Sequence, residues 1–359
     1  MEVNFAIYRE KLITDGWPGA IIDATLDRAI GLGQYENVTF WLVDCDDKLF
    51  TYARRKLSRH NVKIERTTLR AVSSHISAGS WVITHDWFGK LYALMEALEN
   101  VNWLVTLDIV PLYDRLSSTS FVGRVLTSEP AFRALTYKWR RYLSKAKILV
   151  AVSDREARIL KDVYKVSVHA VIPAPISVEL KNTLKLHYLL LIDVKPRDVP
   201  VIRKIVSAFR PGRVIAKDNM DSSILSSIGY PNAEILKNTL PREELLGLMA
   251  AADLVVLSER AGTFEMMPLE IIAAGTPVVT PTVPSVEMLR RYAGDAAIGE
   301  IPFLDLDMAG SLDVPGLQKW FSAAQRSIDD SRLVIEDQFS MKSVGHQLYQ
   351  LITKEAGNG

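Results

Sequence analysis

The sequence predicts an α/β protein made of two Rossmann-like, doubly wound domains. Its 359 residues are about twice the length of a typical single domain. Short runs rich in β-branched residues alternate with amphipathic segments of about ten to fifteen residues, which is typical of βαβ units and parallel sheets. The segment Val171–Ser177 contains two prolines, which exclude a helix and a central strand. We therefore expect domains at residues 1–175 and 176–340, joined by this extended connection.

The first half alternates strand-like runs with segments whose apolar residues recur every three and four positions. We expect strands at Val3–Tyr8, Val38–Val43, Trp81–Thr84, Trp103–Leu107 and Ile148–Val152. We expect helices at Ala20–Leu32, Phe88–Leu98 and Asp154–Val163. This order predicts one doubly wound half.

The second half repeats the alternation. We expect strands at Tyr188–Ile192, Val214–Ala216, Leu254–Leu257 and Val278–Thr280, and helices at Val199–Phe209, Arg242–Ala251 and Leu269–Ala274. The chain from about Gly316 to Ile352 is expected to be helical, with residues 341–359 forming a C-terminal helix.

Composition places the chain among ordinary globular proteins, with 48% hydrophobic and 24% charged residues. We expect no signal peptide and no membrane span, because the start lacks a basic stretch followed by a long apolar one and no segment offers about 18 uncharged apolar residues. Cys45 is the only cysteine, so no intrachain disulfide can form, which fits a reducing compartment. We expect a cytoplasmic protein.

The most specific stretch runs from Ala251 to Thr280. It predicts a buried strand, a loop, a short helix opened by Pro268 and a tight turn into the next strand. A helix N-terminus at the carboxyl end of parallel strands is where a phosphate or a sugar hydroxyl binds. Glu270 lies in the first turn of this helix, where it either contacts such a ligand or only complements the helix dipole, an effect of about 0.3–1 kcal/mol.

This stretch resembles the donor-binding signature of the GT4 family of retaining glycosyltransferases, which includes sucrose synthase-like enzymes and mannosyltransferases. The residues that match the signature in order are Phe264, Pro268, Leu269, Glu270, Ala274, Gly275, Thr276, Pro277, Val278 and Val279. Further resemblance lies at Ser80–Gly89 and Ile148–Ala157. The resemblance implies the GT-B fold, in which two Rossmann-like domains face a central cleft. Residues 1–175 would hold the acceptor, 176–340 the nucleotide sugar, and 341–359 would cross back to the first domain.

The resemblance also implies the residues that contact the donor. Glu270 is implied to bind the ribose hydroxyls. The loop implied to contact the donor sugar comprises Gly262, Thr263, Phe264, Glu265 and Met266. The family has another glutamate eight residues before the ribose-binding one, where this chain has Gly262. Glu265 or Glu259 can reach the same space after a loop shift, or each can be a solvated loop acid, and Glu265 can equally crowd the sugar pocket.

A histidine that lines the donor pocket in the family is missing from this chain. It is expected after the strand Trp103–Leu107, where it is either deleted or replaced by Asp108. His85, which follows another predicted strand, is the nearest residue that could replace it. A histidine in such a position is either a core residue or a ligand contact at the cleft. We name His85 and Asp108 as candidate catalytic residues.

A departing nucleoside diphosphate needs cations, because negative charge grows on its oxygen as the glycosidic bond breaks. The resemblance implies an arginine and a lysine after the first strand of the second domain. Lys195 and Arg197 stand there, with Asp193 in place of the family's glycine. Arg197 is favoured because its planar guanidinium matches phosphate, although either base can be a solvated turn charge. Gly16 follows the first strand, where it can lie near the donor phosphate or simply form a turn.

Asp44-Cys45-Asp46 follows a predicted strand and resembles the Asp-x-Asp metal-binding signature of GT-A glycosyltransferases. Acids after a strand are commoner in a solvated turn. The chain has six dispersed histidines and one cysteine, a pattern that predicts neither a zinc nor a magnesium site. We therefore expect no metal.

Two basic stretches carry aromatic residues, Arg54–Arg70 and Tyr137–Lys147. Residues 1–175 hold 24 bases and 19 acids, whereas the remainder holds 19 bases and 23 acids. Bases beside Trp139 and Tyr142 can hold a helix at an anionic membrane, at about 1 kcal/mol per base, or can form a solvated face. We expect no nucleic-acid partner, because the chain is nearly neutral and shows no recognition module.

The sequence thus predicts a metal-independent retaining glycosyltransferase that needs no cofactor. Its donor would be a UDP- or GDP-sugar, and its acceptor a hydroxyl of a glycan, a lipid or a protein. It would be cytoplasmic, with its first domain able to contact a membrane peripherally. One alternative is a catalytically degenerate GT-B homologue that binds a sugar nucleotide or a partner protein, because of Gly262 and Asp108. A sugar-nucleotide epimerase on the same fold is another.

Overall fold

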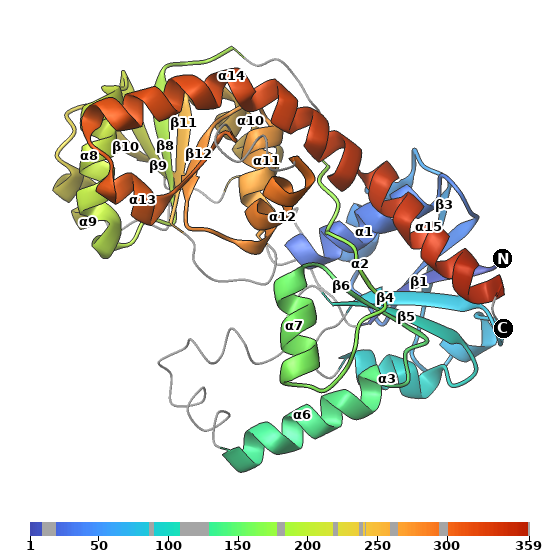
Figure 1. Cartoon of the computed structure of the whole chain (residues 1–359). Helices are drawn as coiled ribbons and strands as arrows, with labels where there is room; N and C mark the ends of the chain where they lie inside the picture. The colour runs from blue at the N-terminus through green and yellow to red at the C-terminus, as the bar shows by residue number, and fades with distance from the viewer. Residues whose placement is uncertain are drawn as a thin grey trace. The chain divides into compact units, whose positions relative to one another are not determined.

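The computed structural model describes residues 1–8, 19–85, 90–107, 129–177, 184–217, 222–236, 240, 242–258, 265–293 and 301–357. The chain divides into two compact units (Figure 1). The first comprises Met1–Pro175 and Phe339–Gly359, and the second comprises Ile176–Ala261 and Glu265–Gln338. The division after Pro175 lies in the proline-containing connection.

The first unit is built on a seven-stranded sheet in the order β3-β2-β1-β4-β5-β6-β7. Every neighbouring pair is parallel. The strands are β1 (Val3–Tyr8), β2 (Val38–Val43), β3 (Val62–Thr67), β4 (Trp81–His85), β5 (Asn102–Leu107), β6 (Ile148–Ala151) and β7 (Ala170–Val171). The central strand β1 is buried along its whole length, as expected for a parallel sheet covered on both faces.

Helices cover both faces of this sheet. They are α1 (Ala20–Leu32), α2 (Asp47–Leu57), α3 (Lys90–Ala97), α6 (Glu129–Leu143), α7 (Asp154–Asp162) and α15 (Met341–Gly357), with a short 3₁₀ turn, η1, at Val72–Ser74. One core contains Leu26 of α1, Leu49 of α2 and Leu348 of α15. The core on the other face contains Trp139 of α6 and Leu160 of α7.

The last helix, α15, packs along α1 at a crossing made by two glycines. A Cβ atom at Gly31 would lie 1.9 Å from the carbonyl oxygen of Met341, and one at Gly345 would lie 2.1 Å from the carbonyl carbon of Gly31. Only glycine allows two helix backbones to approach this closely. Figure 1 shows the two helices side by side, so the C-terminal helix is part of the first unit.

The second unit is built on a six-stranded parallel sheet in the order β10-β9-β8-β11-β12-β13. The strands are β8 (Tyr188–Ile192), β9 (Arg213–Lys217), β10 (Ala233–Leu236), β11 (Leu254–Leu257), β12 (Val278–Thr280) and β13 (Phe303–Asp305). Numbered from β8, this is the order 3-2-1-4-5-6 of a Rossmann sheet.

The second unit is also covered on both faces. Its helices are η2 (Pro196–Asp198), α8 (Val199–Phe209), α9 (Ser222–Ile228), α10 (Arg242–Ala251), α11 (Met267–Ala273), α12 (Pro284–Ala293), α13 (Leu306–Ser311) and α14 (Val314–Phe339). Figure 1 shows α8, α9 and α13 on one face and α10, α11 and α12 on the other. Ile202, Leu225 and Leu306 belong to the core beneath the first group. Among the described residues, no helix is long and apolar enough to cross a membrane.

The α/β prediction is confirmed, although several elements were not predicted, among them α9, β10, α12 and β13. The predicted continuous helical tail is two helices, because the chain breaks at Ser340, whose hydroxyl accepts a hydrogen bond from the backbone N–H of Ser343 at 3.2 Å and opens α15. The basic stretch Arg54–Arg70 contains the end of α2 and all of β3, which the sequence analysis did not identify as elements. Only Val62 and Thr67 of β3 are buried, so the apolar alternation of a strand is missing there.

Candidate functional site

Several predicted donor-site residues lie at the switch point of the second sheet, which is the place where the strand order reverses. Strand β8 pairs with β11, and the chain leaves the two strands in opposite directions along the sheet. Lys195 and Arg197 follow β8, whereas Glu265 and Glu270 follow β11. Ligands of such sheets bind in the crevice outside the carboxyl ends of the strands at this point. The strand order therefore brings together residues that are far apart in the sequence.

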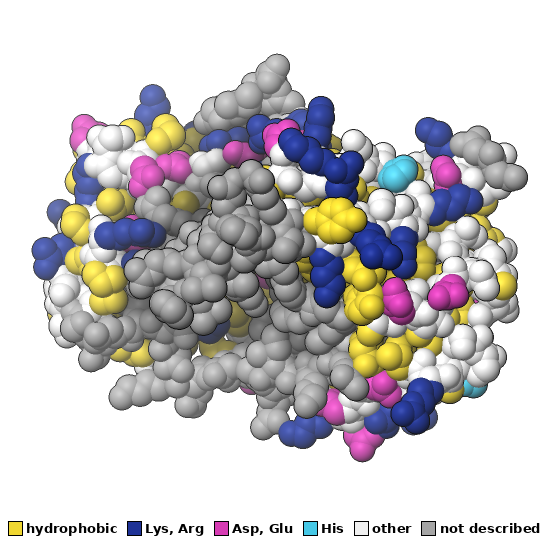
Figure 2. All heavy atoms as spheres, turned by 90° about the horizontal axis from the view of Figure 1, so that it is seen from below, with side chains coloured by type: hydrophobic (Ala, Val, Ile, Leu, Met, Phe, Trp, Pro, Cys, Tyr) yellow, Lys and Arg dark blue, Asp and Glu magenta, His cyan; other side chains and the backbone are white. Residues whose placement is uncertain are grey.

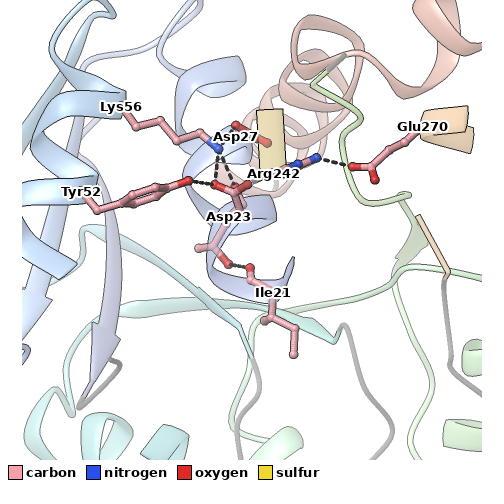
Figure 3. Close-up of polar contacts among 8 residues, drawn as sticks. Ile21, Asp23, Asp27, Tyr52, Lys56, Arg242 and Glu270 are labelled. Carbon is pink, nitrogen blue, oxygen red and sulfur yellow. Dashed lines mark hydrogen bonds and ion pairs between the residues drawn. The ribbon is translucent and has the colours of Figure 1, made fainter. Parts of the chain in front are cut away.

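Glu270 is largely buried and paired with a cation that the sequence analysis did not consider. Its carboxylate forms an ion pair with Arg242, the first residue of α10, as Figure 3 shows. Both α10 and α11 begin at the carboxyl edge of the sheet. The side chains of Arg242 and Glu270 are 18% and 10% exposed, so solvent still reaches the pair. The signal that could have found Arg242 is its place at a helix N-terminus, where the dipole disfavours a base unless an acid balances it.

Lys195 and Arg197 lie on the exposed surface of the turn after β8. Lys195 precedes η2 and Arg197 lies within it. The Arg197 side chain is 62% exposed, and its Nε lies 3.9 Å from Oδ1 of the buried Asp198, at the limit of an ion pair. Asp193 has a positive φ of 53°. That left-handed conformation accounts for a glycine in the related signature, and aspartate is among the few other residues that tolerate it.

His85 lies at the corresponding switch point of the first sheet. It ends β4 beside β1 and is only 4% exposed. Its Nδ1 lies 3.2 Å from the hydroxyl of Thr25, which itself donates its single proton to the carbonyl of Ile21 at 2.8 Å. His85 thus combines a core-like environment with a position at the ligand-binding edge, and its catalytic role stays a prediction.

Glu265 and Met266 immediately precede α11 and are half-buried. The remaining predicted residues lie outside the described part of the chain, and they are Gly16, Asp108, Gly262, Thr263 and Phe264.

Asp44-Cys45-Asp46 forms the turn between β2 and α2. Asp46 caps α2 by accepting from the backbone N–H of Leu49 at 2.8 Å. Asp44, with a φ of 50°, accepts from the N–H of Leu69 at 3.2 Å. The two acids therefore have structural partners, as expected for a turn. Within the described ranges, no group of three or more metal-binding side chains is found.

A second charged cluster lies between α1 and α2 in the first unit. Lys56 Nζ lies 2.5 Å from Asp23 Oδ1 and 2.6 Å from Asp27 Oδ1, and the Tyr52 hydroxyl donates to Asp23 at 2.8 Å (Figure 3). Both carboxylates are almost fully buried. The sequence analysis missed this cluster. The spacing of two acids four residues apart on a mainly apolar helix was the available signal, because like charges at that spacing repel unless a cation joins them.

Comparison with known proteins was made at the level of sequence and of structure. No protein-family model matches the chain, and no curated protein matches its sequence significantly. Sucrose-phosphate synthase from Thermosynechococcus elongatus is similar in structure, with a TM-score of 0.66 and 13% identity over 100% of both chains. An α,α-trehalose-phosphate synthase (UDP-forming) from Burkholderia vietnamiensis has a TM-score of 0.59 and 8% identity over 98% of this chain and 99% of that one.

A third structure is the pneumococcal O-GlcNAc transferase GtfA in complex with UDP and GlcNAc, with a TM-score of 0.54 and 12% identity over 80% of this chain and 60% of that one. These similarities, together with the two Rossmann-like parallel sheets, show that the chain has the GT-B fold. At such identities they concern the fold and not the activity.

Proposed function

We propose that this protein is a retaining glycosyltransferase that moves a sugar from a nucleoside-diphosphate sugar to an acceptor hydroxyl. The observation that carries the proposal is the set of charges at the switch point of the second sheet. Two exposed cations, Lys195 and Arg197, follow β8, and the largely buried pair of Arg242 and Glu270 lies on the helices beyond β10 and β11. A nucleotide diphosphate presents the complementary groups, two acidic phosphates and a ribose with two hydroxyls.

Each residue has a separate role in this proposal. The guanidinium of Arg197 and the ammonium of Lys195 stabilise the negative charge that grows on the departing diphosphate. These cations do this work without a metal ion. One oxygen of Glu270 accepts from the ribose hydroxyls while Arg242 holds the other, so that Arg242 acts as a positioning residue. The acceptor hydroxyl then attacks the anomeric carbon from the face that the diphosphate leaves, the bond from that carbon to the diphosphate oxygen breaks, and the hydroxyl proton passes to the departing diphosphate. Attack from this face retains the anomeric configuration.

The comparisons support the choice of donor. The names of two similar structures contain UDP, once as a product and once as a bound ligand. A UDP- or GDP-sugar is therefore the donor we propose, with the first unit holding a glycan, lipid or protein acceptor. The loop Gly262–Met266 would contact the donor sugar, with Gly16 near its phosphates. His85 and Asp108 would act at the transferring sugar.

The test is a pair of matched variants, Glu270→Ala and Glu287→Ala. Each glutamate is the fourth residue of its helix, α11 or α12, so each complements a helix dipole in the same way. Glu270→Ala should weaken UDP or GDP binding by roughly 1.5–3 kcal/mol, the contribution of a charged hydrogen bond, whereas Glu287→Ala should not. Titration calorimetry measures both. Equal affinities for both variants would remove Glu270 from the site and leave it only a role at the helix dipole.

A catalytically degenerate binding protein is the second candidate, and Gly262 in place of the related family's glutamate favours it. Hydrolysis of a bound donor separates the two candidates, because it needs no acceptor. A wild type that hydrolyses the donor supports the enzyme. A wild type that binds without hydrolysing, and gains slow hydrolysis in Gly262→Glu, supports the degenerate homologue.

A further inference from the structure

Helix α6 carries an exposed basic and aromatic surface that the proposed reaction does not use. We call it the α6 face. It consists of Tyr137, Lys138, Arg141, Tyr142 and Lys145 on α6 and the turn after it, with Tyr92 of α3. Tyr137 is 70% exposed, which is unusual for so large a ring. Viewed from below in Figure 2, basic and hydrophobic side chains adjoin one another on the side that α6 occupies in Figure 1.

The orientation of α6 is fixed by its inner side. Trp139 and Leu143 are one helical turn apart and are buried in the core beneath. Tyr137 and Arg141, also one turn apart, therefore point away from the sheet. The sequence analysis counted Trp139 among the residues that could meet a membrane. That assignment was wrong, because the indole fills the core, and Tyr137 is the ring that faces outward.

The tyrosines of the α6 face are associated with ammonium groups. The rings of Tyr92 and Tyr142 meet edge to face with centroids 4.5 Å apart. Lys138 Nζ lies 5.3 Å from the Tyr92 centroid, and Lys145 Nζ lies 5.4 Å from that of Tyr142. Such cation–π contacts hold the bases at the height of the rings. The α6 face therefore presents amphipathic rings and positive charges side by side.

The stretch of sequence that carries most of the α6 face has only positive charges. Residues 130–153 contain six bases and no acid. Glu96 of α3 lies 3.5 Å from Lys145 and balances it, which leaves Arg133, Lys138, Arg140 and Arg141 on the helix. The helix dipole accounts for Arg140 and Arg141, which lie in the last turn. It does not account for Lys138 or for the exposed ring of Tyr137.

We propose that the α6 face binds anionic lipid headgroups and holds the first unit at a membrane surface. The bases attract the leaflet, and the tyrosines enter the headgroup layer, where a ring with one polar end is most stable. A convex helix face suits a continuous lipid surface better than a single small ligand. The proposal is independent of the transfer reaction, since it involves no residue of the donor site.

The experiment is co-sedimentation of the full chain with vesicles of phosphatidylcholine alone or with one quarter phosphatidylglycerol, and it needs no donor or acceptor. We expect binding to the anionic vesicles only, and release at about 1 M salt, where charges are screened within about 3 Å. Lys138→Gln with Arg141→Gln should lower the partition coefficient about 10- to 30-fold, since each base near the surface contributes a factor of about five. Tyr137→Ser should lower it less.

The matched control is Arg54→Gln with Arg59→Gln, which removes the same charge from exposed positions at and just after α2 in the same unit. It should bind as the wild type does. Equal loss in both double variants would overturn the proposal in favour of a general charge effect. Absence of vesicle binding would also overturn it. So would a result in which the protein binds an acidic protein or an oligonucleotide but not the anionic vesicles. Circular dichroism of each variant confirms that α6 remains folded.

Discussion

The two charged clusters in Figure 3 use the same chemistry in opposite ways. In the first unit, Lys56 joins Asp23 and Asp27 between the faces of two helices, with carboxylates 2% and 1% exposed. In the second unit, Arg242 joins Glu270 between the first turns of two helices, at the carboxyl edge of the sheet, where the Glu270 carboxylate is 10% exposed. The two cations are about equally exposed, Lys56 at 19% and Arg242 at 18%.

The difference shows how position separates a structural charge from one available to a ligand. A cation between helix faces shares the buried charge of its carboxylates, so its loss leaves that charge less well compensated. A pair at the edge of a parallel sheet lies where ligands bind and can exchange one partner for a ligand group. The first cluster should therefore affect stability, and the second should affect binding.

The largest effect is expected from Lys56→Met. It leaves two buried carboxylates without their shared ammonium, and breaking such a cluster costs about 3–5 kcal/mol. Urea unfolding measures the loss. Arg54→Met, on the exposed side of the same helix, is the control and should change stability little. Comparable stability of both variants would show that the Lys56 cluster is not structural.

Gly31→Ala should have the next largest effect on stability. It acts on the interior of the same unit through steric contact and not through charge. The added methyl would lie 1.9 Å from the Met341 carbonyl oxygen, so α15 must shift away from α1, at a cost of about 1–3 kcal/mol or more. Gly247→Ala is the control, since nothing lies within 4 Å of its Cβ position. Thermal unfolding and proteolysis of the C-terminal helix report the result. A variant as stable and as protected as the wild type contradicts the close crossing.

Arg242→Ala should change binding more than stability. If Arg242 acts by holding Glu270, nucleotide affinity falls by about tenfold, or roughly 1.4 kcal/mol. The double variant with Glu270→Ala should then bind no worse than Glu270→Ala alone. Calorimetry with UDP or GDP completes the cycle. Fully additive losses would mean that Arg242 contacts the nucleotide independently.

A pH-dependent effect on stability is expected at the other ends of α10 and α11. Lys185 Nζ contacts the carbonyls of Ala250, Ala252 and Gly275 at 2.9 Å each and the Thr276 hydroxyl at 2.7 Å. Burial lowers the pKa of Lys185 from 10.5 to about 8. Between these values the unfolded chain binds more protons, so this group makes the free energy of unfolding rise with pH. The stability of the wild type relative to Lys185→Met should grow from pH 8 to pH 10, and a flat difference would contradict the lowered pKa.

Much of the fold followed from local sequence. The ends of α1, β8, α8 and β11 are those expected, because continuous apolar runs and helical periodicity are local patterns that burial then reinforces. β3 was missed because its exposed, charged side chains hide the strand pattern. Trp139 was misplaced because a single aromatic among bases does not show which side of a helix faces the core.

The sequence by itself determined the two α/β halves, the connection near Pro175 and, through its resemblance, the candidate role of Glu270. Only the tertiary structure decided which residues meet. Strand order is set by long-range pairing, and it alone brings the carboxyl ends of β8 and β11 together. Arg242 and Glu270 are 28 residues apart, and Gly31 and Gly345 lie near opposite ends of the chain. No periodicity links such positions, because their contact arises from packing across the sheet and between helices.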